Sequence, residues 1–161
     1  MIILDTNVVS AVMRRDANPA VVGWLDNQPV ESLWITAVTV FEVHFGLELM
    51  THGRRRRLLE DEFARALEED FERRILPFDQ NAAREAALIA ARRRQGGRPI
   101  EIRDALIAGI ASARRATLAT RNVRHFVDSK SRSSIRGPRA KAIEVGPPRS
   151  FNLTIENPDL E

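Results

Sequence analysis

The chain has 161 residues, 43% of them hydrophobic and 29% charged, and it contains no cysteine. These values are typical of one globular domain, and no apolar run is long enough to span a membrane. Without cysteine there is no disulfide, thiolate nucleophile or zinc–thiolate centre, so a metal ion would need oxygen or imidazole ligands. The first residues carry no export signal, so we expect a cytoplasmic protein.

Arginine dominates the basic residues. Of the 25 lysines and arginines only Lys130 and Lys141 are lysine, and the net charge is +3. Arginine makes planar two-point contacts to phosphate, which suits a nucleic-acid partner. A coding bias toward arginine explains the same composition, and composition alone favours that explanation.

The first seven residues predict a strand that is buried on both faces and ends in polar groups. Asp5 follows the apolar run directly. The carboxyl end of a strand is where open α/β sheets place their chemistry. The alternative is that Asp5 or Thr6 caps the next helix, which is predicted at residues 7–13. These residues by themselves favour neither interpretation.

A helix at 19–27 and a strand at 33–35 follow, and then a helix at 38–50 that carries a candidate site residue. Its apolar residues at helical spacing predict a core-facing stripe of Val38, Phe41, Phe45 and Leu49. Glu42 lies on that stripe. A carboxylate that faces the core is costly unless it is paired or bound to a metal ion.

Residues 54–71 predict a long charged helix, whose run of arginines at 54–57 is interpreted as a solvated helix end in preference to a phosphate contact. A short strand at 75–76 precedes a helix that Asp79 caps and that ends near Arg94. After a turn at 95–100, the helix at 102–113 is apolar all round and therefore buried. Asp104 stands in its first turn, at the rim of the core.

A strand at 117–119 completes an alternation of strands and helices that predicts a layered α/β domain with a parallel sheet. Residues 127–152 are rich in Ser, Arg, Gly and Pro. We expect one domain over 1–161, in which 127–152 is a mobile basic insertion before a last edge strand. Candidates for additional strands are residues 142–145 and 153–156.

Asp5, Glu42 and Asp104 each stand where a charge is costly or is favoured by a helix dipole. Read one residue at a time, that is the pattern of a divalent-metal site. Each of them also has a plainer interpretation as a helix cap or a chance occurrence.

The chain resembles the PIN-domain ribonucleases, and within them the VapC/FitB-like toxins of type II toxin–antitoxin systems. The resemblance extends from Met1 to Phe126, and residues 97–100 and 157–158 also fit that branch. Its four blocks, in order, are residues 3–10 (ILDTNVVS), 39–46 (TVFEVHFG), 102–108 (IRDALIA) and 119–126 (ATRNVRHF).

The resemblance implies a PIN-like three-layer α/β/α fold with a central parallel sheet, and it implies the site. Asp5, Glu42 and Asp104 would be the catalytic acids that bind Mg²⁺ or Mn²⁺, with Thr6 and Thr120 as supporting residues. The last block often carries a fourth acid, but this chain has Asn122 and His125 at the two places concerned. We expect the loss of that charge to weaken a second metal site more than the first.

The implied activity is that of a toxin, a metal-dependent endoribonuclease. It would cleave a structured RNA such as tRNA or rRNA by metal-activated water and leave 5′-phosphate and 3′-hydroxyl ends. Arg121, Arg124 and Arg98 would position the RNA backbone, unless they serve only solubility. The implied partners are a second copy of the chain and a small antitoxin protein, which often inserts an arginine into the acidic pocket.

Three other classes compete with this assignment. Haloacid-dehalogenase-like phosphatases need a second acid where this chain has Asn7, and receiver-type signalling domains need a lysine where it has none. The third is a PIN-like module that binds RNA or a protein partner without cutting. The missing fourth acid keeps this last alternative open.

Overall fold

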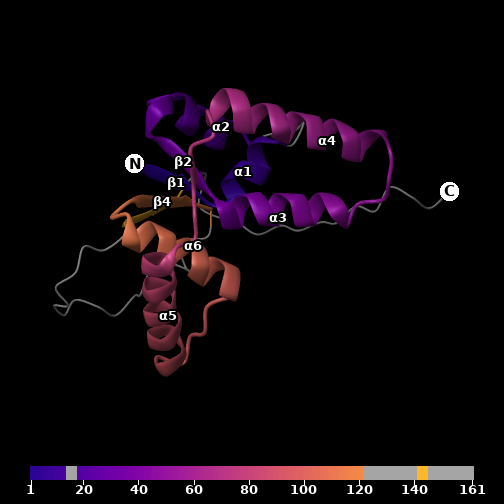
Figure 1. Ribbon diagram of the computed structural model, residues 1–161. Helices are drawn as coiled ribbons and strands as arrows, with labels where there is room; N and C mark the ends of the chain where they lie inside the picture. Colours follow the sequence, from indigo (N-terminus) through magenta and orange to yellow (C-terminus); the bar gives the residue numbers. More distant parts are fainter. Residues whose placement is uncertain (14–17, 122–140, 145–161) are drawn as a thin grey trace.

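The computed structural model describes residues 1–13, 18–121 and 141–144, and within them a five-stranded sheet of order β3-β2-β1-β4-β5 (Figure 1). The strands are β1 (Ile2–Leu4), β2 (Leu33–Thr36), β3 (Ile75–Leu76), β4 (Thr117–Thr120) and β5 (Lys141–Glu144). Every pairing is parallel, as predicted, and Ile3 of the central strand lies opposite Trp34 and Leu118. β5 confirms a strand close to the predicted 142–145, whereas 153–156 lies outside the described residues.

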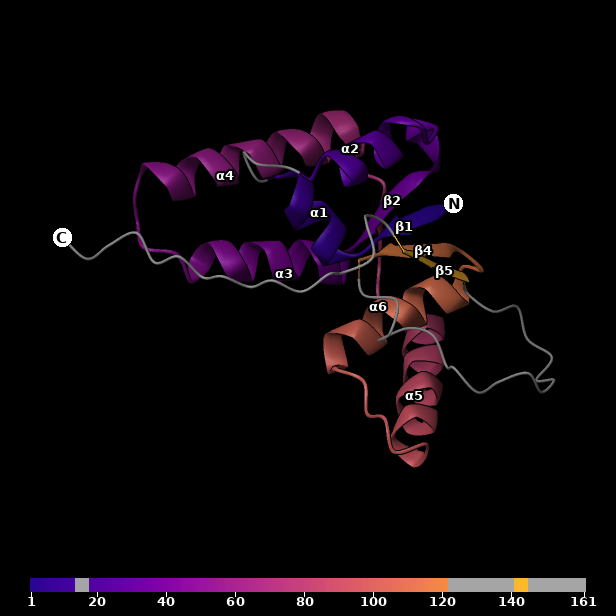
Figure 2. The same ribbon diagram turned by 180° about the vertical axis from the view of Figure 1, so that it is seen from behind.

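The helices cover both faces of this sheet, which confirms the three-layer architecture. They are α1 (Thr6–Val12), α2 (Pro19–Asp26), α3 (Ala37–Glu48), α4 (Arg54–Arg65), α5 (Gln80–Gln95) and α6 (Ile102–Ala113). Helices α1 to α4 lie on one side and α5 and α6 on the other in both views (Figures 1 and 2). None of the helices in this described part is long and apolar enough to cross a membrane.

The side chains of each strand alternate between the two faces of the sheet, so the molecule has two cores, one under each layer of helices. Leu4 and Ala119 pack with α1 to α4, whereas Ile3 and Leu118 pack with α5 and α6. Successive side chains of a strand point to opposite faces of the sheet, so a strand that is apolar at every position suits a sheet covered on both sides.

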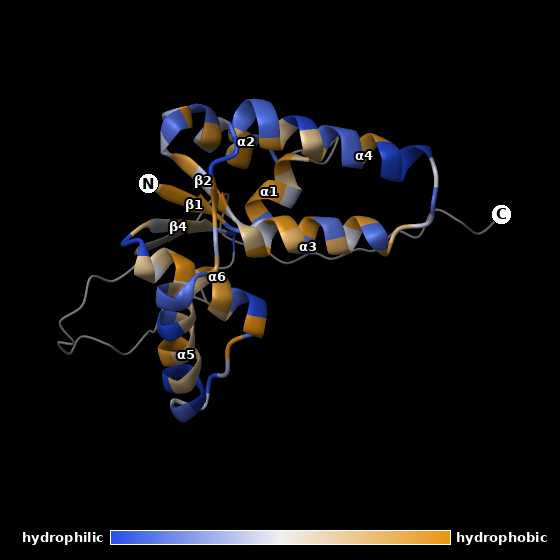
Figure 3. Cartoon of the chain, viewed as in Figure 1, coloured by the Kyte–Doolittle hydropathy of each residue, from blue (hydrophilic) through white to orange (hydrophobic). Residues whose placement is uncertain are grey.

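The predicted apolar stripe of α3 is wrong in part, because three of its four residues are exposed. Phe41 is 57% exposed, Phe45 46% and Leu49 72%, and only Val38 is buried. The buried residues of α3 are instead Val38, Thr39, Val43 and Leu47. An apolar helix offers several stripes at similar spacing, and the one that packs depends on where the neighbouring helices lie. In Figure 3 hydrophobic residues recur along the length of α3, between hydrophilic ones.

The charged helix predicted at 54–71 is formed by α4 and a π-helical turn at Ala66–Asp70, and its apolar side packs on the chain's own core through Phe63 and Phe71. Its arginine run is not a uniformly solvated end. Arg56 is 8% exposed and forms 2.6 Å ion pairs with Glu48 of α3 and Glu60 of α4. This pairing ties α4 to the end of α3.

Candidate acidic active site

The first component of the site is Asp5, at the point where the central strand meets α1. The backbone N–H of Asp5 donates to the carbonyl oxygen of Ala119 at 2.9 Å, so β1 and β4 end side by side. Thr120, the last residue of β4, donates its hydroxyl to Asp5 Oδ2 at 2.7 Å. The Asp5 side chain makes no capping hydrogen bond to α1. Asp5 thus occupies the N-cap position of α1 without capping it through its side chain, and its carboxylate is instead bonded to Thr120 at the end of β4.

Asp5 is held in an environment that disfavours its charge. The residue is 1% exposed. Burial raises its pKa above the ordinary value, and the charge of Asp104 raises that pKa further, while the hydrogen bond from Thr120 acts in the opposite direction. A buried carboxylate beside another carboxylate is stabilised by a bound cation, because the cation relieves both burial and repulsion.

Asp104 comes from the first turn of α6, as predicted. The N-cap of this helix is Glu101, whose Oε2 accepts hydrogen bonds from the backbone N–H groups of Arg103 at 2.8 Å and Asp104 at 3.3 Å. Asp104 is therefore not the cap. Asp104 is partly exposed, and from α6 its negative charge raises the pKa of Asp5. The structure thus brings two of the three predicted acids into one electrostatic site.

Glu42 reaches the same region from α3, but it has other partners. Its side chain is 16% exposed, and Thr6 donates its hydroxyl to Glu42 Oε2. Arg103 Nη1 lies 3.4 Å from Glu42 Oε1. No three acidic or histidine side chains within 1–13 and 18–121 are arranged to hold one metal ion. With oxygen donors alone, Asp5 and Asp104 suit a hard divalent cation, whereas Glu42 already has the positive charge of Arg103 beside it.

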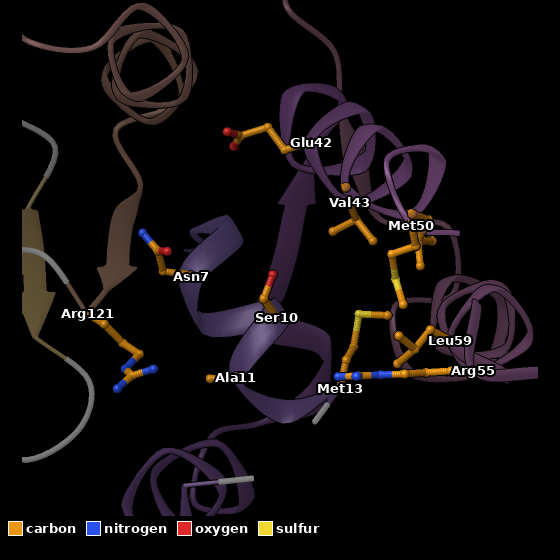
Figure 4. Close-up of a pocket in the computed structure, with 12 residues that line it drawn as sticks. Asn7, Ser10, Ala11, Met13, Glu42, Val43, Met50, Arg55, Leu59 and Arg121 are labelled. Carbon is orange, nitrogen blue, oxygen red and sulfur yellow. The ribbon is translucent and has the colours of Figure 1, made fainter. Parts of the chain in front are cut away.

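A pocket of about 350 Å³ extends from this site between α1, α3 and α4 (Figure 4). Its lining residues are Asn7, Ser10, Ala11, Met13, Glu42, Val43, Gly46, Leu47, Met50, Arg55, Leu59 and Arg121. Glu42, Asn7 and Arg121 form the polar end, whereas Met13, Met50 and Leu59 gather beside Arg55 at the other end (Figure 4). The pocket therefore extends from Glu42, one of the predicted acids, to a largely apolar end.

Of the three arginines predicted to contact RNA, Arg121 lines this pocket. Arg98 is exposed in the connection between α5 and α6 and is not among the lining residues. Arg124 lies outside the described residues, as do Asn122 and His125.

Arg103 was not among the predicted site residues, although it stands directly before Asp104. A signal was present. A cation in the first turn of a helix opposes the helix dipole, so an arginine there needs a carboxylate nearby to offset the cost. Glu101 and Glu42 both supply one.

Comparison with known proteins identifies the family of the chain. The PIN domain model matches residues 2–128. VapC ribonuclease Y4jK of Sinorhizobium fredii is 36% identical over 126 residues, which are 78% of this chain and 90% of the relative. Toxin FitB of Neisseria gonorrhoeae is also 36% identical over 126 residues, 78% of this chain and 91% of the relative.

Solved structures give the same result. The crystal structure of FitAcB from Neisseria gonorrhoeae matches with a TM-score of 0.72 at 36% identity, over 78% of this chain and 91% of that chain. The sequence match and the parallel three-layer fold agree on one conclusion. The chain belongs to the PIN domain family.

Proposed function

We propose that the protein is the toxin of a toxin–antitoxin pair and acts as a metal-dependent endoribonuclease on a structured RNA such as tRNA or rRNA. The observation that carries this proposal is the buried carboxylate of Asp5. It lies where β1 and β4 end side by side, and the charge of Asp104 from α6 acts on it. The relatives named VapC ribonuclease and Toxin FitB support the assignment of the activity and of the biological role.

The residues have separate roles in this proposal. Asp5 and Asp104, joined by Glu42, would hold Mg²⁺ or Mn²⁺, with Thr120 and Thr6 fixing two of the carboxylates. When bound, such an ion lowers the pKa of a water molecule and stabilises charge on the phosphate oxygens. Arg121 lines the same pocket as Glu42, and its guanidinium would hold an RNA phosphate there.

The direct test is cleavage of a panel of end-labelled structured RNAs with Mg²⁺, with Mn²⁺ and with EDTA. We expect cleavage only with a divalent ion, at a few sites, with 5′-phosphate and 3′-hydroxyl ends. Ends that carry a 2′,3′-cyclic phosphate would exclude hydrolysis by a metal-activated water. Cleavage that persists in EDTA would exclude the metal requirement.

A PIN-like module that binds RNA without cutting is the second candidate. It is favoured by the Glu42–Arg103 contact and by the lack of a three-carboxylate group in the part of the chain that the structure describes. Such a module would retain RNA in a gel-shift assay and leave every RNA of the panel intact with either ion.

The pocket supports an antitoxin as the protein partner. Its apolar end at Met13, Met50 and Leu59 would bury apolar side chains of an inserted segment, and its acidic end would accept an arginine from that segment. A guanidinium can replace a divalent cation among carboxylates without supplying metal chemistry. An antitoxin bound in this way would inhibit RNA cleavage by keeping the metal ion and the RNA out of the site.

We also propose a homodimer through the exposed side of α3. Phe41 and Phe45 stack with ring centroids 5.8 Å apart, and Leu49 continues their row by another turn. These side chains stand outside the residues that line the pocket, so a second copy and an antitoxin would use different faces. Exposed aromatic rows of this kind are typical of protein interfaces.

The double substitution Phe41→Ser with Phe45→Ser is expected to convert the dimer to a monomer, because it removes two aromatic side chains from the contact on each copy. Sedimentation equilibrium measures the mass directly. The matched control is Leu88→Ser, which alters an exposed apolar residue of α5 and should leave the dimer intact. A double variant that is as dimeric as the wild type would place the interface elsewhere.

A further inference from the structure

Arg103 is the basic side chain that contacts the acidic site from within α6. Its Nε donates to Glu101 Oε1 at 3.0 Å, and its Nη1 lies 3.4 Å from Glu42 Oε1. The guanidinium therefore joins the N-cap of α6 to the acid that α3 contributes. Glu101 anchors one side of the guanidinium and leaves the other side directed to Glu42.

The two contacts account for a side chain that would otherwise be unfavourable at this position. A positive charge in the first turn of a helix is repelled by the helix dipole, and the carboxylates offset that repulsion. The Arg103 side chain is 42% exposed, whereas the Glu42 side chain is 16% exposed. Arg103 thus approaches from the solvent side and neutralises a carboxylate that is largely withdrawn from water.

Each carboxylate oxygen of Glu42 has one partner in this arrangement. Thr6 donates to Oε2, and Arg103 faces Oε1. A guanidinium keeps its positive charge at every physiological pH, so Arg103 repels a divalent cation that binds the same carboxylate. A divalent cation that takes Glu42 as a ligand therefore competes with Arg103 for that carboxylate.

We propose that Arg103 is an internal counter-cation of the acidic site, which holds Glu42 until a divalent cation replaces it and thereby lowers the affinity of the site for that cation. This inference rests on the proposed function, because it takes Asp5, Glu42 and Asp104 as the metal-binding acids. Arg103 is a positioning residue in this scheme. It sets the metal concentration at which the site is filled.

The test is calorimetric titration of the full chain with Mn²⁺, without RNA. The variants are Arg103→Ala, which removes the charge, and Arg103→Lys, which keeps it. Arg92→Ala removes one charge from the exposed C-terminal turn of α5 and controls for the net charge of the protein. Asp5→Asn identifies the site that is titrated, because it removes a proposed ligand.

Arg103→Ala is expected to bind Mn²⁺ about two- to fivefold more tightly than the wild type, the range set by a partly exposed ion pair. Arg103→Lys and Arg92→Ala should stay close to the wild-type affinity. Equal or weaker binding by Arg103→Ala, while Asp5→Asn loses binding, would overturn the role of Arg103 and leave the metal site standing. Absence of Mn²⁺ binding in the wild type would overturn the metal dependence itself, and this inference with it.

Discussion

Asp5→Asn is expected to lower metal-dependent RNA cleavage by more than about 100-fold, since even groups that only orient a metal ligand typically contribute about 10- to 100-fold. Asp5 is the most buried of the three acids and lies at the junction of β1, β4 and α1. The amide keeps the size of the side chain and an oxygen that can accept the Thr120 hydrogen bond, but it has no charge for a cation. RNA affinity in a gel shift should be preserved.

The same substitution should leave the metal-free protein at least as stable as the wild type at neutral pH. Burial and the charge of Asp104 raise the pKa of Asp5 in the folded state, so the folded state binds more protons than the unfolded state between the ordinary and the raised pKa. Stability then falls as the pH rises through that window, and the deficit remains at higher pH. The amide of Asp5→Asn does not titrate, so the variant does not lose stability in this way.

Thermal melts in EDTA across acid and neutral pH measure this difference. The Tm of Asp5→Asn relative to the wild type should rise with pH, while the exposed control Asp26→Asn should follow the wild type throughout. With Mn²⁺ added, the Tm of the wild type should increase and that of Asp5→Asn should not. A fully active variant would exclude Asp5 from catalysis, and a variant destabilised at neutral pH would show that the Asp5 carboxylate stabilises the fold.

Gly109→Ala is expected to destabilise the protein by about 1–3 kcal/mol, the usual cost of overpacking a core, which corresponds to roughly 2–12 °C in Tm for a chain of this size. Gly109 lies where α6 crosses α5. A Cβ built on it would stand 2.5 Å from the carbonyl oxygen of Ala82 and 2.6 Å from the Cβ of Ala86. Backbone cannot yield as a flexible side chain does, so the two helices must move apart.

The measurement is thermal or urea unfolding, with Gly23→Ala in α2 as the matched control. A Cβ on Gly23 would meet no atom within 4 Å. Alanine is favoured over glycine in a helix by about 1 kcal/mol, so this control should be neutral or more stable than the wild type. If Gly109→Ala were as stable as the control, the close approach of α5 and α6 would not exist in solution.

Local features of the chain were predictable from the sequence. Apolar runs, Pro19 at the start of α2, and the Asp79 cap of α5 are set by neighbouring residues, and the elements they predict are present. The parallel sheet followed from the alternation of strands and helices. Asp5 and Asp104 also stood out, because each is placed at the end of an apolar element where a charge is unusual.

The tertiary structure decided which of these features meet. The sheet order brings Thr120 to Asp5, 115 residues apart in the chain. Phe41 and Phe45 were predicted to face the core and are exposed, whereas Arg56 was predicted to be solvated and is buried in ion pairs. Arg103 was recognised only through its contact with Glu42 on another helix. The physical reason is that helical spacing defines which residues share a face, whereas packing against distant segments determines whether that face is buried.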